Sequence, residues 1–452
     1  MVAKVPLIPV ILGNAAVQDW EIHHVDIKSA YLNALLKEKV YMKLLPGVLN
    51  PGEEGKVCWL LKGLYGLHQA GRGWYKEMAG VFVNKLGFKK SAVNHSVFYW
   101  RTKDEHTIVV VATDNMAITL KWLQDVEKLK DELRQHWKIS DLGELTWYLG
   151  FCVCWDQNAR TIAINQQSYI KGMLEKFALT SAKPVLMPMD PSTKFLNKQC
   201  LLTLTQLAKM CGILYAEVIG SVLWPVIISR PDCAFAILTL VQFIQNPAQA
   251  HWEAVKRVMV YLGTTRVLWL TFSGKWTTKS ITWGYCDTDW AGQPHQHLIS
   301  GYSFHIGQGV VMWSSKKQYI IALLSTELEY IVLVHATKEG LWMCTFLSEV
   351  QDVPRETMEL SLDNQGVIAL SKDNKLHQHM KHINIRYHFI CEAVEDGLIR
   401  TNYVPMDQNP ANIFIKALFE TKFCGFVAGL GLNAWREEEK QDVLSWSNQR
   451  ML

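Results

Sequence analysis

The sequence lacks the cysteine pattern of a zinc site or of a disulfide framework. Its ten cysteines are scattered without a Cys-x-x-Cys pair, and only Cys152 and Cys154 come near a ligand spacing. Reduced thiols of this kind are typical of the cytosol and the nucleus, so we expect an intracellular protein in one of these two compartments.

A long apolar segment is also missing. The longest apolar stretch, 213–228, contains Glu217 and Pro225 and is too short and too interrupted to cross a bilayer, which predicts no membrane span and no membrane partner. The apolar residues near the start weakly resemble a signal peptide. Pro6 and Pro9 interrupt them, so we expect that the protein is not secreted.

A strong excess of charge is absent as well. Lysine and arginine number 46 and aspartate and glutamate 42, which gives a net charge of +4. A surplus this small allows a polyanionic partner without requiring one. No internal repeat or low-complexity linker is present, and 452 residues with 49% hydrophobic content suffice for about two to four globular domains.

The periodicity of the sequence changes along the chain. Short β-like runs alternate with helical ones up to about residue 178, a proline-rich connector follows at 183–191, and a helical pattern extends over about 203–272. From about 280, three strands precede a long helix and further strands and helices, which predicts a mixed sheet flanked by helices. The residues after about 420 are weakly patterned, so we expect a peripheral tail there.

Acidic residues recur at the boundaries of the predicted elements. In the second half they lie in the segments 284–292, 325–330 and 362–365. Carboxylates that converge from separate elements are the ligands that a pair of divalent ions requires. This layout is typical of a two-metal nuclease.

Together with 25–33, 57–69 and 112–115, these segments resemble the reverse transcriptase and ribonuclease H region of copia-type retrotransposon Pol polyproteins, over about residues 12–418. Since the chain starts about 25 residues before Asp26, the resemblance implies an N-terminally truncated member without most of its fingers. The implied fold is an α+β and α/β multidomain protein. Its parts are a partial reverse transcriptase palm at 1–180, a thumb or connection at 181–275, an RNase H-like mixed five-stranded sheet with flanking helices at 276–420, and a C-terminal tail at 421–452.

In the reverse transcriptase part, the resemblance assigns metal-binding catalytic carboxylates to Asp26, at a strand end, and to Asp114, at a hairpin tip. The family's second hairpin acid is Asn115 here, and an amide oxygen holds a hard dication less firmly than a carboxylate does. With two carboxylates instead of three, we expect severely impaired polymerisation. The resemblance assigns nucleotide and sugar sensing to Tyr31, Gly66 and Gln69.

In the nuclease part, the resemblance assigns the metal-binding catalytic acids to Asp287, Glu329 and Asp363, with Glu327 as the alternative helix acid. Asn412 occupies the place of a fourth acid. Three carboxylates neutralise most of the charge of two Mg²⁺ ions, so we expect slowed or Mn²⁺-favouring hydrolysis rather than none.

The resemblance also implies the partners and the cofactor. The partners are an RNA template, a DNA primer and an RNA:DNA hybrid, with deoxynucleoside triphosphates as substrates if the polymerase is active. The cofactor is Mg²⁺, two ions per site, with Mn²⁺ as a substitute. Two other interpretations stay open, a catalytically decayed retroelement product that only binds nucleic acid and a stand-alone hybrid nuclease.

Overall fold

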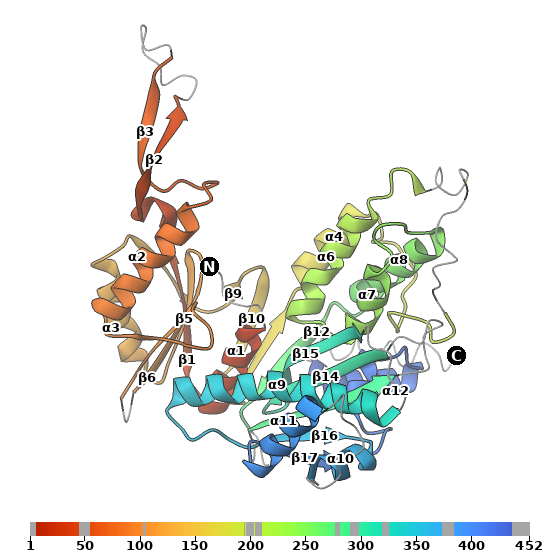
Figure 1. Cartoon of the computed structure of the whole chain (residues 1–452). Helices are drawn as coiled ribbons and strands as arrows, with labels where there is room; N and C mark the ends of the chain where they lie inside the picture. Colours follow the sequence, from red (N-terminus) through yellow and green to blue (C-terminus); the bar gives the residue numbers. More distant parts are fainter. Residues whose placement is uncertain are drawn as a thin grey trace. The chain divides into compact units, whose positions relative to one another are not determined.

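The chain forms two compact units in a computed structural model (Figure 1). The described residues are 6–44, 55–102, 105–193, 195, 203, 210–275, 281–289, 298–318, 325–372 and 384–435. The first unit contains Trp20–Leu145 and Phe346–Val353. The second contains Val5–Asp19, Thr146–Thr345 and the chain from Pro354 onward.

The first unit is built on a six-stranded sheet with the order β4-β5-β6-β7-β1-β8. Its strands are β1 (Glu21–Ile27), β4 (Lys89–Lys90), β5 (Val97–Arg101), β6 (His106–Ala112), β7 (Asn115–Leu120) and β8 (Ile139–Glu144). Valine and isoleucine fill the buried centre of β6, as expected for an internal strand. β6 and β7 form an antiparallel hairpin that turns at Thr113 and Asp114, which confirms the predicted hairpin.

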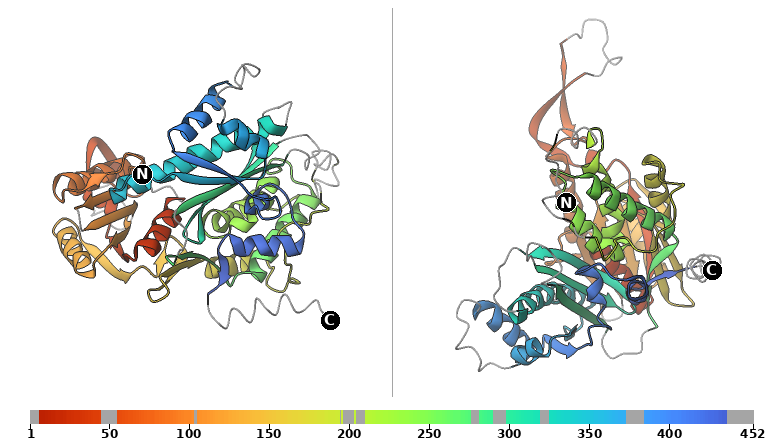
Figure 2. Two further views of the ribbon diagram at one scale, coloured as in Figure 1. Left: turned by 90° about the horizontal axis from the view of Figure 1, so that it is seen from below. Right: turned by 90° about the vertical axis from the view of Figure 1, so that its right-hand side faces the viewer.

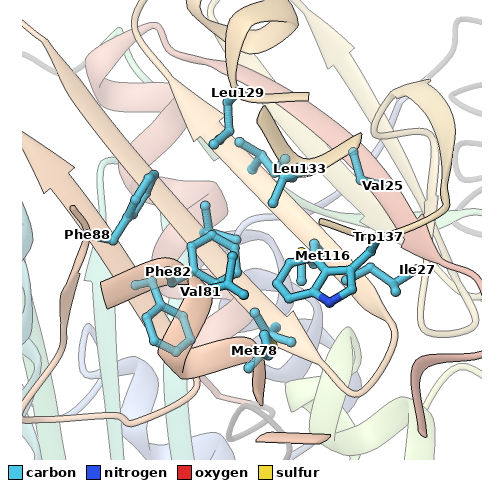
Figure 3. Packing of buried hydrophobic residues seen from close by; sticks show 14 of the residues in the cluster. Val25, Ile27, Met78, Val81, Phe82, Phe88, Met116, Leu129, Leu133 and Trp137 are labelled. Atoms are coloured by element: carbon cyan, nitrogen blue, oxygen red, sulfur yellow. The ribbon is translucent and has the colours of Figure 1, made fainter. Parts of the chain in front are cut away.

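Helices α2 (Ala70–Asn84) and α3 (Leu123–Arg134) pack their apolar side chains on this sheet (Figure 3). β1 contributes Val25 and Ile27 to the same core. Because successive strand residues point to opposite faces, the burial of this pair turns His24 and Asp26 to the other face of the sheet. The helices contribute, among others, Trp74, Met78, Val81, Phe82, Leu129 and Leu133.

A two-stranded ribbon also belongs to the first unit. It pairs β2 (Leu35–Lys43) with β3 (Val57–Lys62), and the 3-10 helix η1 (Ala30–Asn33) leads into it from β1. In Figure 1 the ribbon extends beyond the end of the six-stranded sheet. The paired side chains of Tyr41 and Trp59 are both more than half exposed.

The second unit contains a five-stranded antiparallel sheet in the order β18-β12-β11-β10-β9. Its strands are β9 (Trp147–Tyr148), β10 (Phe151–Asp156), β11 (Thr161–Asn165), β12 (Leu268–Ser273) and β18 (Leu432–Ala434). Helix α1 (Leu7–Gln18) packs against this sheet and against β15 (Gly309–Gln318), where Gly13 lies so close to Val311 that an added Cβ would come within 3.0 Å of it. Further helices of this unit are α4 (Gln167–Lys176), α6 (Tyr215–Ile228), α7 (Ala234–Val241) and α8 (Gln249–Thr264).

The predicted peripheral tail is wrong for the residues up to 434. Helix α12 (Glu420–Gly429) buries Phe423 and Phe426, and β18 pairs with β12. Weak periodicity did not indicate this, because a short edge strand gains its partner from a segment about 160 residues earlier. The residues from 436 onward lie outside the described part of the chain.

A second five-stranded sheet has the order β15-β14-β13-β16-β17. β14 (Leu298–Ile306) and β15 (Gly309–Gln318) continue antiparallel from β13 (Thr282–Asp289), whereas β16 (Met358–Leu362) and β17 (Ile399–Tyr403) run parallel to β13. Helix α9 (Ser325–Gln351) lies along one face of the sheet (Figure 2). The other helices here are α10 (Gln365–Lys372) and α11 (Asn384–Glu395).

The predicted fold class is therefore confirmed, including the mixed five-stranded sheet with flanking helices. After Asn409 the chain forms the 3-10 turn η5 (Pro410–Phe414), and α12 follows. No helix in the described ranges, α9 with its 27 residues included, has the length and hydropathy that a membrane span needs.

Candidate active sites

The first candidate site lies where β1 meets the tip of the β6–β7 hairpin. Asp26 is opposite Asn115 in the antiparallel register, and the Ile27 N–H donates to the Asp114 carbonyl at 2.9 Å. Burial and then the charge of Asp114 raise the pKa of Asp26. The structure thus brings Asp26, Asp114 and Asn115 together on the face of the sheet opposite to helices α2 and α3.

Trp74 of α2 fixes the hairpin tip. Its Nε1–H donates to the Thr113 carbonyl at 2.7 Å, and Thr113 has a left-handed φ of 64°, which a β-branched residue rarely adopts. Trp74 is itself anchored in the core. The sequence did not predict this role of Trp74, because its hydrogen bond to a residue 39 positions away depends on how α2 packs.

Tyr31 lies in η1, and its ring centroid is 4.6 Å from that of Tyr65. Burial, then the charge of Asp114, then Tyr31 and Asp26 raise the pKa of Tyr65, so this phenol faces the same acids. Tyr65 was not predicted. Gly66 follows it with a φ of 92°, and Gln69 precedes α2 without capping it through its side chain.

The carboxamide of Asn115 makes two side-chain hydrogen bonds. Its Nδ2 donates to Asp114 Oδ1 at 3.1 Å, and its Oδ1 is 2.9 Å from His24 Nε2. His24 carries no sequence pattern that points to this contact, since it depends on the register of β1 against β7.

The second candidate site lies at the carboxyl ends of β13 and β16. These strands are parallel neighbours, in a register that pairs Trp283 with Glu359 and Tyr285 with Ser361. Two residues further along, the same register places Asp287 level with Asp363, which directly follows β16. Parallel strands that end at one edge of a sheet thus bring two acids together from positions 76 residues apart.

The acids of this site repel one another. Burial and then the charge of Asp363 raise the pKa of Asp287 to about 8, while the Thr288 N–H, which donates to Asp287 Oδ1 at 2.7 Å, and Lys416 act in the opposite direction. Burial also raises the pKa of Glu329 on α9, a hydrogen bond to Asn364 opposes the shift, and Asp363 adds to it. The three predicted acids therefore influence each other electrostatically.

Asn412, the predicted fourth position, lies in η5, which packs against β13. Its Nδ2 donates to the carbonyls of Met406 at 2.9 Å and Asn409 at 3.0 Å. The side chain of Asn409 docks η5 on β13, because its Nδ2 donates to the Cys286 carbonyl at 3.1 Å. Asn409 is a positioning residue that the sequence prediction missed, although the Asn-Pro pair at 409–410 was the available signal.

Among the predicted positions, two buried oxygens have no hydrogen-bond partner within the described residues, Asp287 Oδ2 and Asn412 Oδ1. Buried acids that repel one another and oxygens without donors are what a divalent cation would satisfy, so these residues fit a metal site. Within the same described residues, no three His, Cys, Asp or Glu side chains already form a metal-ligand group. The alternative acid, Glu327, has its side chain outside the described part of the structure.

Residues 1–191 match the family described as reverse transcriptase (RNA-dependent DNA polymerase). The chain is 33% identical over 436 residues to the retrovirus-related Pol polyprotein from transposon TNT 1-94 of Nicotiana tabacum. It is 32% identical over 432 residues to the corresponding polyprotein from transposon RE1 of Arabidopsis thaliana. These alignments cover 96% and 95% of this chain but 32% and 29% of those polyproteins, so the chain spans about a third of their length.

Among solved structures, that of the foamy viral protease-reverse transcriptase in complex with double-stranded DNA is similar. It is 10% identical, with a TM-score of 0.42, over 85% of this chain and 56% of that chain.

Proposed function

Because the chain belongs to the copia-type Pol polyproteins of retrotransposons and contains their reverse transcriptase domain, we propose that it is a reverse transcriptase and ribonuclease H fragment. Its second site hydrolyses the RNA of RNA:DNA hybrids, and its polymerase site is impaired. The observation that carries the nuclease proposal is the register of β13 against β16, which places the buried Asp287 level with Asp363.

In the nuclease site, Asp287, Glu329 and Asp363 would hold the divalent ions, and Asn412 would add its amide oxygen. Two Mg²⁺ ions bound there would activate a water and stabilise the leaving oxygen of the RNA strand. The Thr288 N–H engages one oxygen of Asp287, which leaves the other oxygen for the ions. The single amide among the four ligands reduces the negative charge, so Mn²⁺ supports the reaction better than Mg²⁺.

In the polymerase site, Asp26 and Asp114 are the two carboxylates that could hold a metal-bound deoxynucleoside triphosphate beside a DNA primer on an RNA template. In this proposal Tyr31 excludes a ribose 2′-hydroxyl by steric contact, supported by Tyr65, whose ring lies against that of Tyr31. The family's third carboxylate is the amide of Asn115, which explains why this activity is the weaker of the two.

Cleavage of a labelled RNA:DNA hybrid by the full chain tests the nuclease proposal. We expect cleavage in Mn²⁺ and slower cleavage in Mg²⁺, with loss of both in Asp287→Asn. Asp396→Asn removes the same charge at an exposed position of the same unit and should cleave like the parent chain. Equal cleavage by the parent chain and Asp287→Asn would refute the assignment.

The second proposal is a decayed retroelement product that only binds nucleic acid. The amides at Asn115 and Asn412 favour it, because each stands where the resemblance implies a carboxylate. Such a protein would bind the hybrid with an affinity that falls steeply as salt rises and would cleave it in neither metal.

A further inference from the structure

The orientation of the Asn115 carboxamide follows from the chemistry of its neighbours. A carboxylate only accepts hydrogen bonds, so the group that lies 3.1 Å from Asp114 Oδ1 must be the NH₂ of Asn115. The amide oxygen then lies toward His24, 2.9 Å from Nε2, and Nε2 must carry a hydrogen to donate to it. A flipped amide would place its oxygen against the Asp114 oxygen and its NH₂ against the His24 N–H.

The sheet register explains why His24 can reach this amide. Asn115 lies opposite Asp26, and His24 precedes Asp26 by two residues on the same face of β1. Diagonal neighbours across an antiparallel pair are within reach of a long side chain. Hydrogen bonds from Trp74 to Thr113 and from Ile27 to Asp114 hold the backbone of the hairpin. The Asn115 amide therefore stays within reach of His24.

We propose that His24 is a positioning residue that locks the Asn115 carboxamide with its NH₂ group, rather than its oxygen, toward the acids. In this arrangement Asn115 is no substitute ligand. Its oxygen is engaged by His24, and its NH₂ occupies a lone pair of Asp114 that a divalent ion would otherwise use. The hairpin thus offers an ion fewer oxygens than its sequence suggests. The inference rests on the polymerase site of the proposed function.

Binding of Mn²⁺, measured by the electron paramagnetic resonance signal of the free ion, tests the lock without any activity. The full chain carries Asp287→Asn and Asp363→Asn throughout, so that the nuclease site is silent. In this background, His24→Phe keeps a ring but removes the donor, and the freed amide can turn its oxygen to the ion. We expect several-fold tighter binding than in the parent chain.

Two further variants complete the series. His24→Gln retains a donor and should bind Mn²⁺ like the parent. Asn115→Asp supplies a carboxylate and should bind on the order of tenfold more tightly, because hard dications prefer charged oxygen ligands. If Asn115→Asp tightens binding but His24→Phe does not, His24 does not position the amide and the inference fails.

The failure of the proposed function has a different signature. If Asp26→Asn does not weaken Mn²⁺ binding in this background, the ion is not bound at the polymerase site at all. A metal-free measurement then still decides the lock. In spectra of ¹⁵N-labelled histidine, the signal that His24→Phe removes should come from a ring with hydrogen on Nε2, and hydrogen on Nδ1 alone would overturn the inference. Thermal unfolding confirms that each variant is folded.

Discussion

Restoring the apparent fourth carboxylate of the nuclease site, by Asn412→Asp, should destabilise the metal-free protein. Asn412 is fully buried, and its Nδ2 donates to the carbonyls of Met406 and Asn409 at 2.9 and 3.0 Å. A carboxylate has no hydrogen to donate, so both carbonyls lose this donor. At about 1 to 1.5 kcal/mol for each lost hydrogen bond, the free energy of unfolding falls by about 2 to 3 kcal/mol.

Two further effects add to this loss in Asn412→Asp. The new carboxylate oxygen lies against the two carbonyl oxygens, and it joins a site where Asp287, Glu329 and Asp363 already repel one another. Asn412→Ala, the matched control, loses the same two hydrogen bonds without adding a charge. We therefore expect the order of stability in EDTA to be parent, then Asn412→Ala, then Asn412→Asp.

Divalent ions should reverse the order of the two variants. A fourth carboxylate strengthens the binding of Mg²⁺, and an ion that binds only the folded state stabilises that state. The assay is thermal unfolding of the three proteins in EDTA and in saturating Mg²⁺, where 1 kcal/mol corresponds to about 2 to 4 °C for a domain of this size. An Asn412→Asp protein as stable as the parent in EDTA would refute the reasoning about Nδ2.

Three other predictions concern the two units. In EDTA, the free energy of unfolding should fall as pH rises from about 4 to about 8. The reason is that Asp287, with a pKa of about 8 in the folded state, binds its proton more tightly there than in the unfolded state. Urea unfolding at several pH values should show a flatter dependence for Asp287→Asn. Trp74→Phe removes the 2.7 Å hydrogen bond to the Thr113 carbonyl, so the free energy of urea unfolding should fall by about 1 kcal/mol. Mn²⁺ binding at the first site should weaken as well. Unchanged binding would show that this hydrogen bond does not position the hairpin tip. Asp232→Ala leaves the buried Arg230 guanidinium without its carboxylate partner, so the free energy of unfolding should fall by about 3 to 5 kcal/mol. An unchanged thermal midpoint would show that Arg230 reaches water in the variant.

The sequence alone determined the local elements and the chemical character of both sites. Two β-like runs on either side of residues 112–115 predicted the β6–β7 hairpin, three- and four-residue spacing predicted α8, and the acids at strand ends indicated metal chemistry. These features depend on near neighbours in the chain, so they can be read from the sequence. The quoted motifs also sufficed to identify the family.

The tertiary structure decided which groups meet and what each can offer. Asp287 is level with Asp363 only because β13 and β16 are parallel in one register, and the Asn115 oxygen meets His24, 91 residues away, only because β1 pairs with β7. The sequence placed Asn115 and Asn412 alike, as amides in place of acids. In the structure the two amides differ. The oxygen of Asn115 accepts from His24, whereas the oxygen of Asn412 is buried without a donor in the described part of the chain. Hydrogen-bond partners are set by packing across long sequence separations, and no local pattern encodes them.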